Sequence, residues 1–312
     1  MECIYRKIES NIDGLLLDTL MIKPEDAPKA IVQLVHGMAE YKERYVPFME
    51  YLAERGYICI IHDHRGHGES VKTPEDYGYL YDTSGVALVE DAHQVTEMIK
   101  VEYPDLPLYL FGHSMGSLVV RSYTKKYDDE LSGLIVCGSP SANPLIAVAK
   151  GLAKLLMKVK GERAAGKLLH KMAFSTYLNG IENPKSENDW LSYNEANVSA
   201  YDKDPKCGFM FTNNGFYNLF CVLSDTYDKK GWAMNNPKLP VFFISGEEDP
   251  CMTNKKAFED AVRTMREVGY KNTKAKLYPH MRHEILNEDD KNKVYHDVIK
   301  ILKRFENDNK ID

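Results

Sequence analysis

Short apolar runs alternate with amphipathic stretches along most of this chain. Because parallel strands joined by helices produce such an alternation, the pattern predicts a mostly parallel central sheet with helices on both faces. The first two strands, separated by Asn11–Gly14, are expected to form a hairpin. Strands are predicted at Ile4–Ile8, Leu15–Ile22, Ala30–Val35, Tyr57–His62, Leu108–Gly112, Leu134–Cys137, Leu239–Ser245 and Ala275–Tyr278. Helices are predicted at Tyr45–Arg55, Gly85–Val101, after Met115, at Asn254–Val268 and at Glu288–Phe305.

The alternation of strands and helices is interrupted in the middle of the chain. Between residues 141 and 232 the composition shifts first to Lys, Ala and Leu and then to Asn, Tyr and Phe. The alternation resumes after Trp232, so the interruption is an insertion rather than a separate linear domain. We therefore expect an α/β domain made of residues 1–140 and 233–312, with residues 141–232 forming an inserted, mainly helical cap.

Composition narrows the class of protein. The chain has 312 residues, of which 44% are hydrophobic and 28% charged, as in soluble globular proteins. Its net charge of -6 argues against nucleic acid as a partner. The N-terminus lacks the apolar core of a signal peptide, and no apolar stretch approaches membrane-spanning length. The six cysteines show no metal-ligand spacing, so we expect a cytoplasmic protein with free thiols.

The first candidate for chemistry is the segment Gly112-His-Ser-Met-Gly116. It is a G-x-S-x-G pattern placed between a predicted strand and a predicted helix, which is the context of a nucleophilic serine on a sharp turn. Glycines on both sides of Ser114 remove Cβ atoms that would collide in such a turn. The N–H of Met115, at the start of the helix, would face a developing oxyanion. The pattern alone is weak and needs a base, an acid and a second oxyanion donor.

Candidates for the acid and the base follow later strands. Asp249 comes directly after the strand Leu239–Ser245, and His283 lies between the next strand and the last helix. The chain order Ser114, Asp249, His283 is the order of a hydrolase triad. In this arrangement Asp249 orients His283, which accepts the serine proton. Neighbouring residues that compete for these roles, with weaker positions in the chain, are Glu247, Glu248 and His280.

The second oxyanion donor is expected in the loop after the strand Ala30–Val35. There Gly37 allows close approach of the backbone, and the N–H of Met38 would join that of Met115. We expect His36 to be a packed, hydrogen-bonded structural residue. The segment Asp63–Ser70 contains three candidate metal ligands, but no partner cluster stands elsewhere, so it is expected to support the serine turn instead.

Taken together, these motifs resemble the monoglyceride lipase and lysophospholipase branch of the α/β-hydrolases. The resemblance covers nearly the whole catalytic domain and implies a triad of Ser114, Asp249 and His283. It also implies an oxyanion hole at Met38 and Met115, and a cap that forms the entrance for lipid. The motifs that carry it are His36-Gly-Met-Ala-Glu-Tyr41, Asp63-His-Arg-Gly-His-Gly-Glu-Ser70, Gly112-His-Ser-Met-Gly116, Gly246-Glu-Glu-Asp-Pro250 and Arg282-His-Glu284.

The start of the insertion is basic and amphipathic. Seven lysine and arginine residues and one glutamate lie between Ser141 and Ser175, and Lys150, Lys154 and Lys158 fall on one helical stripe. One interpretation is a helix that touches anionic lipid surfaces, which would make the protein peripheral at membranes. The other, which we favour from sequence alone, is an ordinary cap helix with its lysines in water and its apolar side on the active site.

The sequence therefore predicts a serine carboxylester hydrolase that forms an acyl-enzyme on Ser114. Monoacylglycerols or lysophospholipids are the leading substrate class. Acyl transfer needs a nucleophile, a base and oxyanion donors, so no metal or organic cofactor is expected. The alternatives are a short-chain carboxylesterase, a peptidase, a C–C hydrolase, or a non-catalytic α/β-hydrolase that binds a ligand. The sequence leaves the oligomeric state open.

Overall fold

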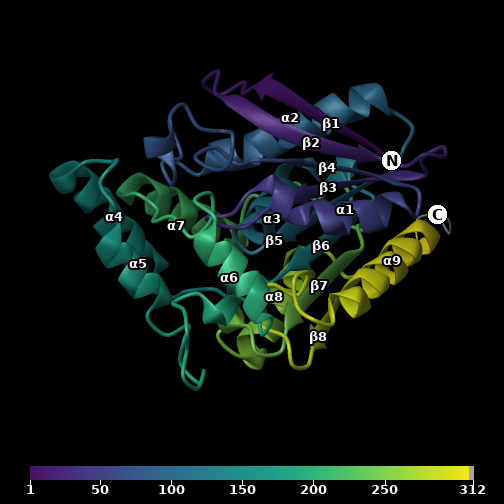
Figure 1. Cartoon of the computed structure of the whole chain (residues 1–312). Helices are drawn as coiled ribbons and strands as arrows, with labels where there is room; N and C mark the ends of the chain where they lie inside the picture. Colours follow the sequence, from purple (N-terminus) through teal and green to yellow (C-terminus); the bar gives the residue numbers. More distant parts are fainter. Residues whose placement is uncertain (309–312) are drawn as a thin grey trace.

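One eight-stranded sheet forms the centre of the molecule. The computed structural model describes residues 1–308, and in it the strands follow the order β1-β2-β4-β3-β5-β6-β7-β8 (Figure 1). The pairs from β4 through β8 are parallel, whereas β1–β2 and β2–β4 are antiparallel. The predicted mostly parallel sheet and N-terminal hairpin are thus confirmed. The strands are β1 (Glu2–Glu9), β2 (Leu16–Lys23), β3 (Ala30–Val35), β4 (Tyr57–His62), β5 (Leu108–His113), β6 (Gly133–Cys137), β7 (Val241–Gly246) and β8 (Thr273–Tyr278).

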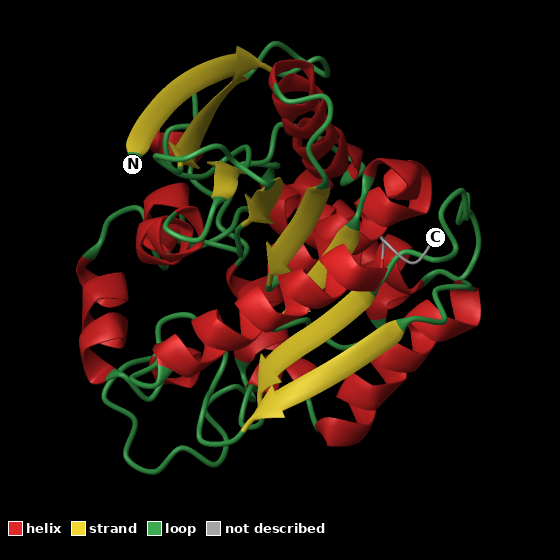
Figure 2. Cartoon of the chain, turned by 90° about the vertical axis from the view of Figure 1, so that its right-hand side faces the viewer, coloured by secondary structure: helices red, strands yellow, loops and turns green. Residues whose placement is uncertain are grey.

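Helices cover both faces of the sheet because its central strands are apolar on both sides. In β3, Ile31 and Val35 pack into one buried cluster, and Val32 and Leu34 pack into the other. Helices α2, α3 and α8 complete the first cluster, and α1 and α9 complete the second. Figure 2 shows helices on both sides of the strands. These helices are α1 (Val46–Ala53), α2 (Val86–Glu102), α3 (Met115–Tyr127), α8 (Lys255–Val268) and α9 (Lys291–Asp308).

The predicted helices are present. The sequence pattern also predicts that one face of α2 is apolar and contains Val86, Leu88, Val89, Val95, Met98 and Ile99, but the prediction is wrong for Val86. Val86, the first residue of α2, is 45% exposed, whereas Leu88 is buried. The two positions lie about 200° apart around the helix, so they cannot face the sheet together. None of the helices within residues 1–308 is both long enough and apolar enough to cross a membrane. Five short 3₁₀ helices also occur in this range: η1 (Lys42–Tyr45), η2 (Pro74–Asp76), η3 (Asp128–Glu130), η4 (Asp189–Leu191) and η5 (Pro250–Met252).

Residues 141–232, here called the inserted segment, connect β6 to β7 and contain helices but no strand of the sheet. Helix α7 packs against both α4 and the sheet-covering helix α3. Figure 1 shows α4, α5 and α7 together on the side of the molecule away from the C-terminal helix α9. The assignment of residues 141–232 as a separate cap domain stays a prediction. The helices of the inserted segment are α4 (Ile146–Lys160), α5 (Lys167–Phe174), α6 (Glu195–Lys203) and α7 (Asn213–Tyr227).

Candidate active site

Ser114 lies on a tight turn between β5 and α3. Its backbone has φ 54° and ψ -119°, a conformation that non-glycine residues adopt only where the surrounding structure holds them. A Cβ atom on Gly112 would lie 2.4 Å from the carbonyl oxygen of Gly116, and one on Gly116 would lie 2.0 Å from that of Val35. The two glycines are therefore required for the turn to fit against the end of β3.

Asp249 and His283 contact each other at the carboxyl ends of β7 and β8. Nδ1 of His283 lies 3.0 Å from both carboxylate oxygens of Asp249, and both residues are buried. Ser245 Oγ and the backbone N–H of Cys251 each donate a hydrogen bond of 2.8 Å to the same carboxylate. Burial alone would raise the pKa of Asp249, but its pairing with His283 and these hydrogen bonds lower it below its ordinary value. Asp249 is therefore held as an anion that fixes the orientation of the imidazole.

The competing residues lie outside this pair. The side chain of His280 is 94% exposed, and its Nδ1 lies 3.7 Å from Glu248 at the surface. The carboxylate of Glu248 also accepts a short hydrogen bond from the Tyr193 hydroxyl. Glu247 is exposed as well. The structure thus brings together Asp249 and His283 and places the three rivals in solvent.

The loop that follows β3 lies against the serine. A Cβ atom on Gly37 would lie 3.1 Å from that of Ser114. The N–H of Gly37 donates to Glu40 Oε1 at 2.6 Å, and the N–H of Ala39 donates to His67 Nε2 at 3.2 Å. Among the hydrogen bonds of residues 1–308, none uses the intervening N–H of Met38. The N–H of Met115 is the first of helix α3 and has no partner within that helix.

Ser114 and His283 lie at the same edge of the sheet. The N–H of Ser114 donates to the carbonyl of Cys137, and a Cβ atom on the next residue, Gly138, would lie 3.2 Å from His283 Cε1. The hydrogen bonds of the described chain do not include one between the Ser114 hydroxyl and His283. Nε2 of His283 instead contacts the thiol of Cys251, at 3.8 Å.

Comparison with known proteins identifies the family of the chain. The family described as serine aminopeptidase, S33 (Hydrolase_4), matches residues 26–290. The chain belongs to this family. It is 27% identical to the monoacylglycerol lipase of Mycolicibacterium smegmatis over 277 residues, which are 88% of each protein. It is 23% identical to the probable lysophospholipase L2 of Haemophilus influenzae over 92% of this chain and 87% of that protein.

A solved structure supports the same fold for this S33-family chain. The thermostable carboxyl esterase of Bacillus coagulans, crystallised with glycerol, superposes with a TM-score of 0.88 and 27% identity. The match covers 98% of this chain and 99% of that one. The predicted α/β-hydrolase fold and the resemblance to monoacylglycerol lipases are both confirmed.

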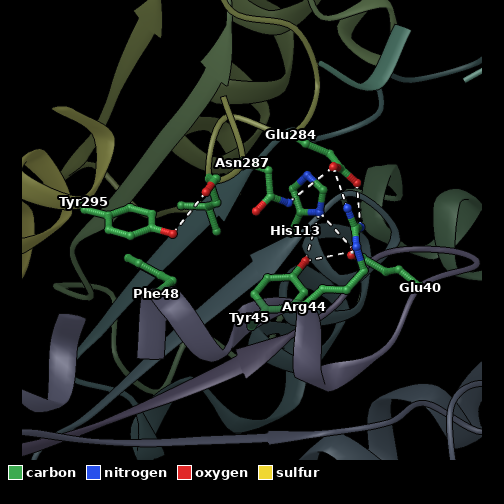
Figure 3. Close-up of a pocket in the computed structure, with 9 residues that line it drawn as sticks. Glu40, Arg44, Tyr45, Phe48, His113, Glu284, Asn287 and Tyr295 are labelled. Atoms are coloured by element: carbon green, nitrogen blue, oxygen red, sulfur yellow. Dashed lines mark hydrogen bonds and ion pairs between the residues drawn. The ribbon is translucent and has the colours of Figure 1, made fainter. Parts of the chain in front are cut away.

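A buried charged network, which the sequence interpretation missed, joins the two loops of the site. Arg44 donates hydrogen bonds of 2.7 Å to both carboxylate oxygens of Glu284 and one of 2.7 Å to Glu40 (Figure 3). Glu40 also lies 3.3 Å from Nδ1 of His113, and Nε2 of His113 lies 3.3 Å from the carbonyl oxygen of His283. The network therefore ties the loop after β3 to the residues flanking Ser114 and His283.

Electrostatics explains why this network holds its charges in the interior. Burial alone would raise the pKa of Glu40, but its hydrogen bond to His113 and the charge of Arg44 lower that pKa to about 2. Burial also opposes ionisation of Glu284, yet Arg44 holds its pKa below the ordinary value. The only signals in the sequence were the i,i+4 spacing of Glu40 and Arg44 and the position of Glu284 beside His283.

The inserted segment contacts the same network. Asn197 in α6 donates a hydrogen bond of 2.6 Å to Glu284, and the ring of Tyr201 lies 4.9 Å from the Arg44 guanidinium. The Tyr201 hydroxyl donates to the carbonyl of Ala39 at 2.9 Å. Helix α6 is thus anchored to both loops of the candidate site.

The segment Asp63–Ser70 is hydrogen-bonded to the loop after β3. Asp63 accepts hydrogen bonds from the Lys42 backbone and ammonium groups, at 2.8 and 2.7 Å. Arg65 forms a buried ion pair with Asp91, 2.8 Å apart, on α2. The hydrogen bonds of this segment position the neighbouring loop, and its support of the serine turn stays a prediction.

Four histidines in and beside these two segments are buried, and desolvation is the largest cause that lowers the pKa of each: His36, His62, His64 and His67. The pKa of His62 falls to about 3 and that of His67 to about 4. Both ring nitrogens of His62 lack a hydrogen-bond partner within the described residues. As expected, His36 is packed and hydrogen-bonded: its Nε2 accepts from the N–H of His64 at 2.9 Å.

These pKa values predict loss of stability in mild acid. The unfolded chain takes up a proton on His62 below about pH 6.5, whereas the native chain takes it up only near pH 3, so acid favours unfolding. Replacing His62 with Gln should reduce the loss of unfolding free energy between pH 7 and pH 5 by about 2 kcal/mol. Urea unfolding at both pH values measures this. The exposed control His280→Gln should not change the loss, and equal losses in all three proteins would contradict the assignment.

The charged network predicts a second stability effect. Arg44→Met leaves two buried carboxylates without their cation, which should lower the unfolding free energy by about 3–5 kcal/mol. Adding Glu284→Gln should restore part of that loss. The matched control is Arg263→Met, which removes a guanidinium that is 58% exposed and paired with Asp260, and should cost less than about 1 kcal/mol. Similar small losses in both single variants would refute a structural role for the network.

Proposed function

We propose that this chain is a serine carboxylester hydrolase that cleaves the acyl ester of monoacylglycerols or lysophospholipids. The observation that carries the proposal is the buried, hydrogen-bonded pair of Asp249 and His283 at the same sheet edge as Ser114 on its strained turn. Separate strands supply the three residues, in the order expected of a hydrolase triad.

The proposed reaction has two halves. His283 Nε2 takes the hydroxyl proton of Ser114 as its oxygen attacks the ester carbonyl, and Asp249 stabilises the imidazolium that forms. The N–H groups of Met38 and Met115 stabilise the oxyanion. The imidazolium then gives its proton to the leaving alcohol, which departs and leaves the acyl group on Ser114. In the second half His283 activates a water molecule, which releases the fatty acid and restores the serine.

Apolar and aromatic side chains of the inserted segment favour a lipid-like acyl group. The ring of Trp190 lies 5.0 Å from that of His283, centroid to centroid, and the ring of Tyr177 lies 4.8 Å from Trp190. Phe174 extends the row, 6.0 Å from Trp190. The acyl chain that extends from the ester carbonyl would therefore contact apolar side chains. The relatives whose names specify monoacylglycerol or lysophospholipid support the same substrate class.

The outer face of α4 supports contact with an anionic lipid surface. From sequence alone we expected the apolar side of this helix to be buried, but several of its apolar residues are exposed beside lysines. They are exposed because α4 packs mainly on α7, so one side of the helix is covered and the rest is left in solvent. A row of apolar side chains flanked by cations is typical of helices that lie at a membrane surface. The exposed apolar residues are Leu145, Val148, Leu155 and Val159.

A panel of substrates tests the reaction and the substrate class together. It should contain acetyl to palmitoyl esters, monoacylglycerols, a lysophospholipid and an aminoacyl amide, the last because of the family's description as serine aminopeptidases. We expect the highest kcat/KM on long-chain monoacyl lipids. Ser114→Ala should lower it at least about 10³-fold, and Ser122→Ala, in the same helix, should leave it nearly unchanged. Preference for the amide would replace the esterase proposal with a peptidase, and preference for acetyl esters would refute the lipid substrate.

Vesicle sedimentation tests the lipid surface. Binding should be stronger to phosphatidylcholine vesicles that contain phosphatidylglycerol than to phosphatidylcholine alone. Replacing Val148 and Leu155 with Asp should weaken binding roughly tenfold, since two apolar side chains would no longer insert. The matched control is Val101→Asp, which changes an 85% exposed valine on α2. Equal weakening by both changes, or no binding to either vesicle, would contradict this function of α4.

A further inference from the structure

The thiol of Cys251 occupies a position that the proposed reaction does not use. It follows Asp249 by two residues, is buried, and lies 3.8 Å from Nε2 of His283. Sγ of Cys251, one imidazole nitrogen of His283 and one carboxylate oxygen of Asp249 all lie within 4.8 Å of one another. Within residues 1–308 this is the one group of three or more Cys, His, Asp or Glu residues close enough to hold a metal ion.

The arrangement has the chemistry of a zinc-binding site. A tetrahedral zinc ion, with Zn–S of about 2.3 Å and Zn–N of about 2.1 Å, holds its sulfur and nitrogen ligands roughly 3.6 Å apart. The observed separation of 3.8 Å between Cys251 Sγ and His283 Nε2 needs little adjustment to reach this value. Thiolate and imidazole are ligands that suit zinc, whereas magnesium and calcium prefer oxygen ligands.

The surroundings of His283 complete the site. Its Nδ1 hydrogen-bonds to Asp249, so Nε2 carries the free electron pair that a metal requires. A carboxylate that holds the other ring nitrogen of a metal-bound histidine is the usual second shell of a zinc site. Ser114, at the same sheet edge, is partly exposed, which gives an ion and its remaining water ligands a route from solvent.

We propose that Cys251 and His283 bind a zinc ion that inhibits the enzyme. Binding forms a Zn–S bond as the thiol releases its proton to solvent, and a Zn–N bond to the lone pair of His283 Nε2, with water in the other positions. This inference rests on the proposed function, because a metal on Nε2 removes the base that deprotonates Ser114. Zinc dissociation would restore the free imidazole, so the inhibition is reversible.

Inhibition of the protein, first treated with EDTA, tests the proposal through activity. Zn²⁺ should block hydrolysis of a chromogenic ester, and added EDTA should restore it. Cys251→Ala should raise the zinc concentration for half-inhibition at least about tenfold, because one of two protein ligands is lost. Cys207→Ala, which changes a buried cysteine of the inserted segment, should leave that concentration unchanged. Equal inhibition of all three proteins, or none in the unmodified protein, would overturn the proposal.

Cobalt binding tests the site without relying on activity. Co²⁺ added to the Ser114→Ala protein should produce a near-ultraviolet thiolate-to-cobalt charge-transfer band, and Zn²⁺ should remove the band by competition. Adding Cys251→Ser should abolish it, with circular dichroism and thermal melting confirming that the variant is folded. Absence of the band in the parent protein would refute the metal site. A band in the Ser114→Ala protein, combined with no ester hydrolysis by the unmodified protein, would keep the metal site and refute the proposed function.

Discussion

The site depends on the tight turn at Ser114. This turn holds a serine at positive φ, and its backbone packs directly against the backbone of β3. Gly116 lies so close to β3 that even a methyl group would overlap the carbonyl of Val35. That contact fixes the start of α3 against the loop that follows β3. The same approach places Gly37 beside Ser114, so the serine lies against the loop that carries the N–H of Met38, which is unbonded within the described chain. A displacement of Gly37 or Gly116 would therefore displace both Ser114 and the loop after β3.

The second organising feature is the distribution of buried charge around this point. Arg44 pairs with the carboxylates of both Glu40 and Glu284, which belong to loops more than two hundred residues apart in the chain. Ion pairs of this kind cost desolvation, so their net effect on stability is small while both partners are present. Their geometric effect is larger, since they hold the loop after β3 and the loop of His283 in one arrangement and connect both to α6.

The histidines near the site differ in whether a carboxylate lies beside them. His283 keeps a carboxylate partner and a free Nε2, as a base requires. His113 also has a carboxylate partner, and although burial opposes its charged form, Glu40 raises its pKa. His62 and His67 have no such partner and stay neutral in the folded chain. Environment rather than residue type therefore separates the imidazoles that have a carboxylate partner from those that stay neutral.

The sequence predicted the ranges of strands best where both faces of the strand are buried. The predicted ranges Ala30–Val35 and Tyr57–His62 coincide with β3 and β4. In both, polar or glycine residues bound a short apolar run, so the sequence indicates where the strand begins and ends. The sequence also predicts a buried stripe on the last helix, made of Val294, Val298, Ile301, Leu302 and Phe305. This stripe is confirmed, because all five residues of α9 lie in one buried cluster.

The sequence did not predict which residues far apart along the chain contact each other. Nothing in the spacing of residues indicates that Arg44 meets Glu284, because the fold alone brings the two loops together. The periodicity of α4 showed that it was amphipathic, but it did not show that Val148 and Leu155 would be left uncovered by α7. The position of Cys251 against Nε2 of His283 depends on the path of the loop after β7, which no local pattern specifies.

The most direct test of the central claim is covalent labelling of the nucleophile by a fluorophosphonate probe, read by peptide mass spectrometry. The account predicts one labelled residue, Ser114, and loss of labelling in a folded His283→Ala variant, whose serine is no longer activated. Labelling should persist in His280→Ala, because that imidazole is in solvent. An unlabelled Ser114 in folded, metal-free protein, or labelling that does not depend on His283, would contradict the serine hydrolase mechanism and favour a ligand-binding role for this fold.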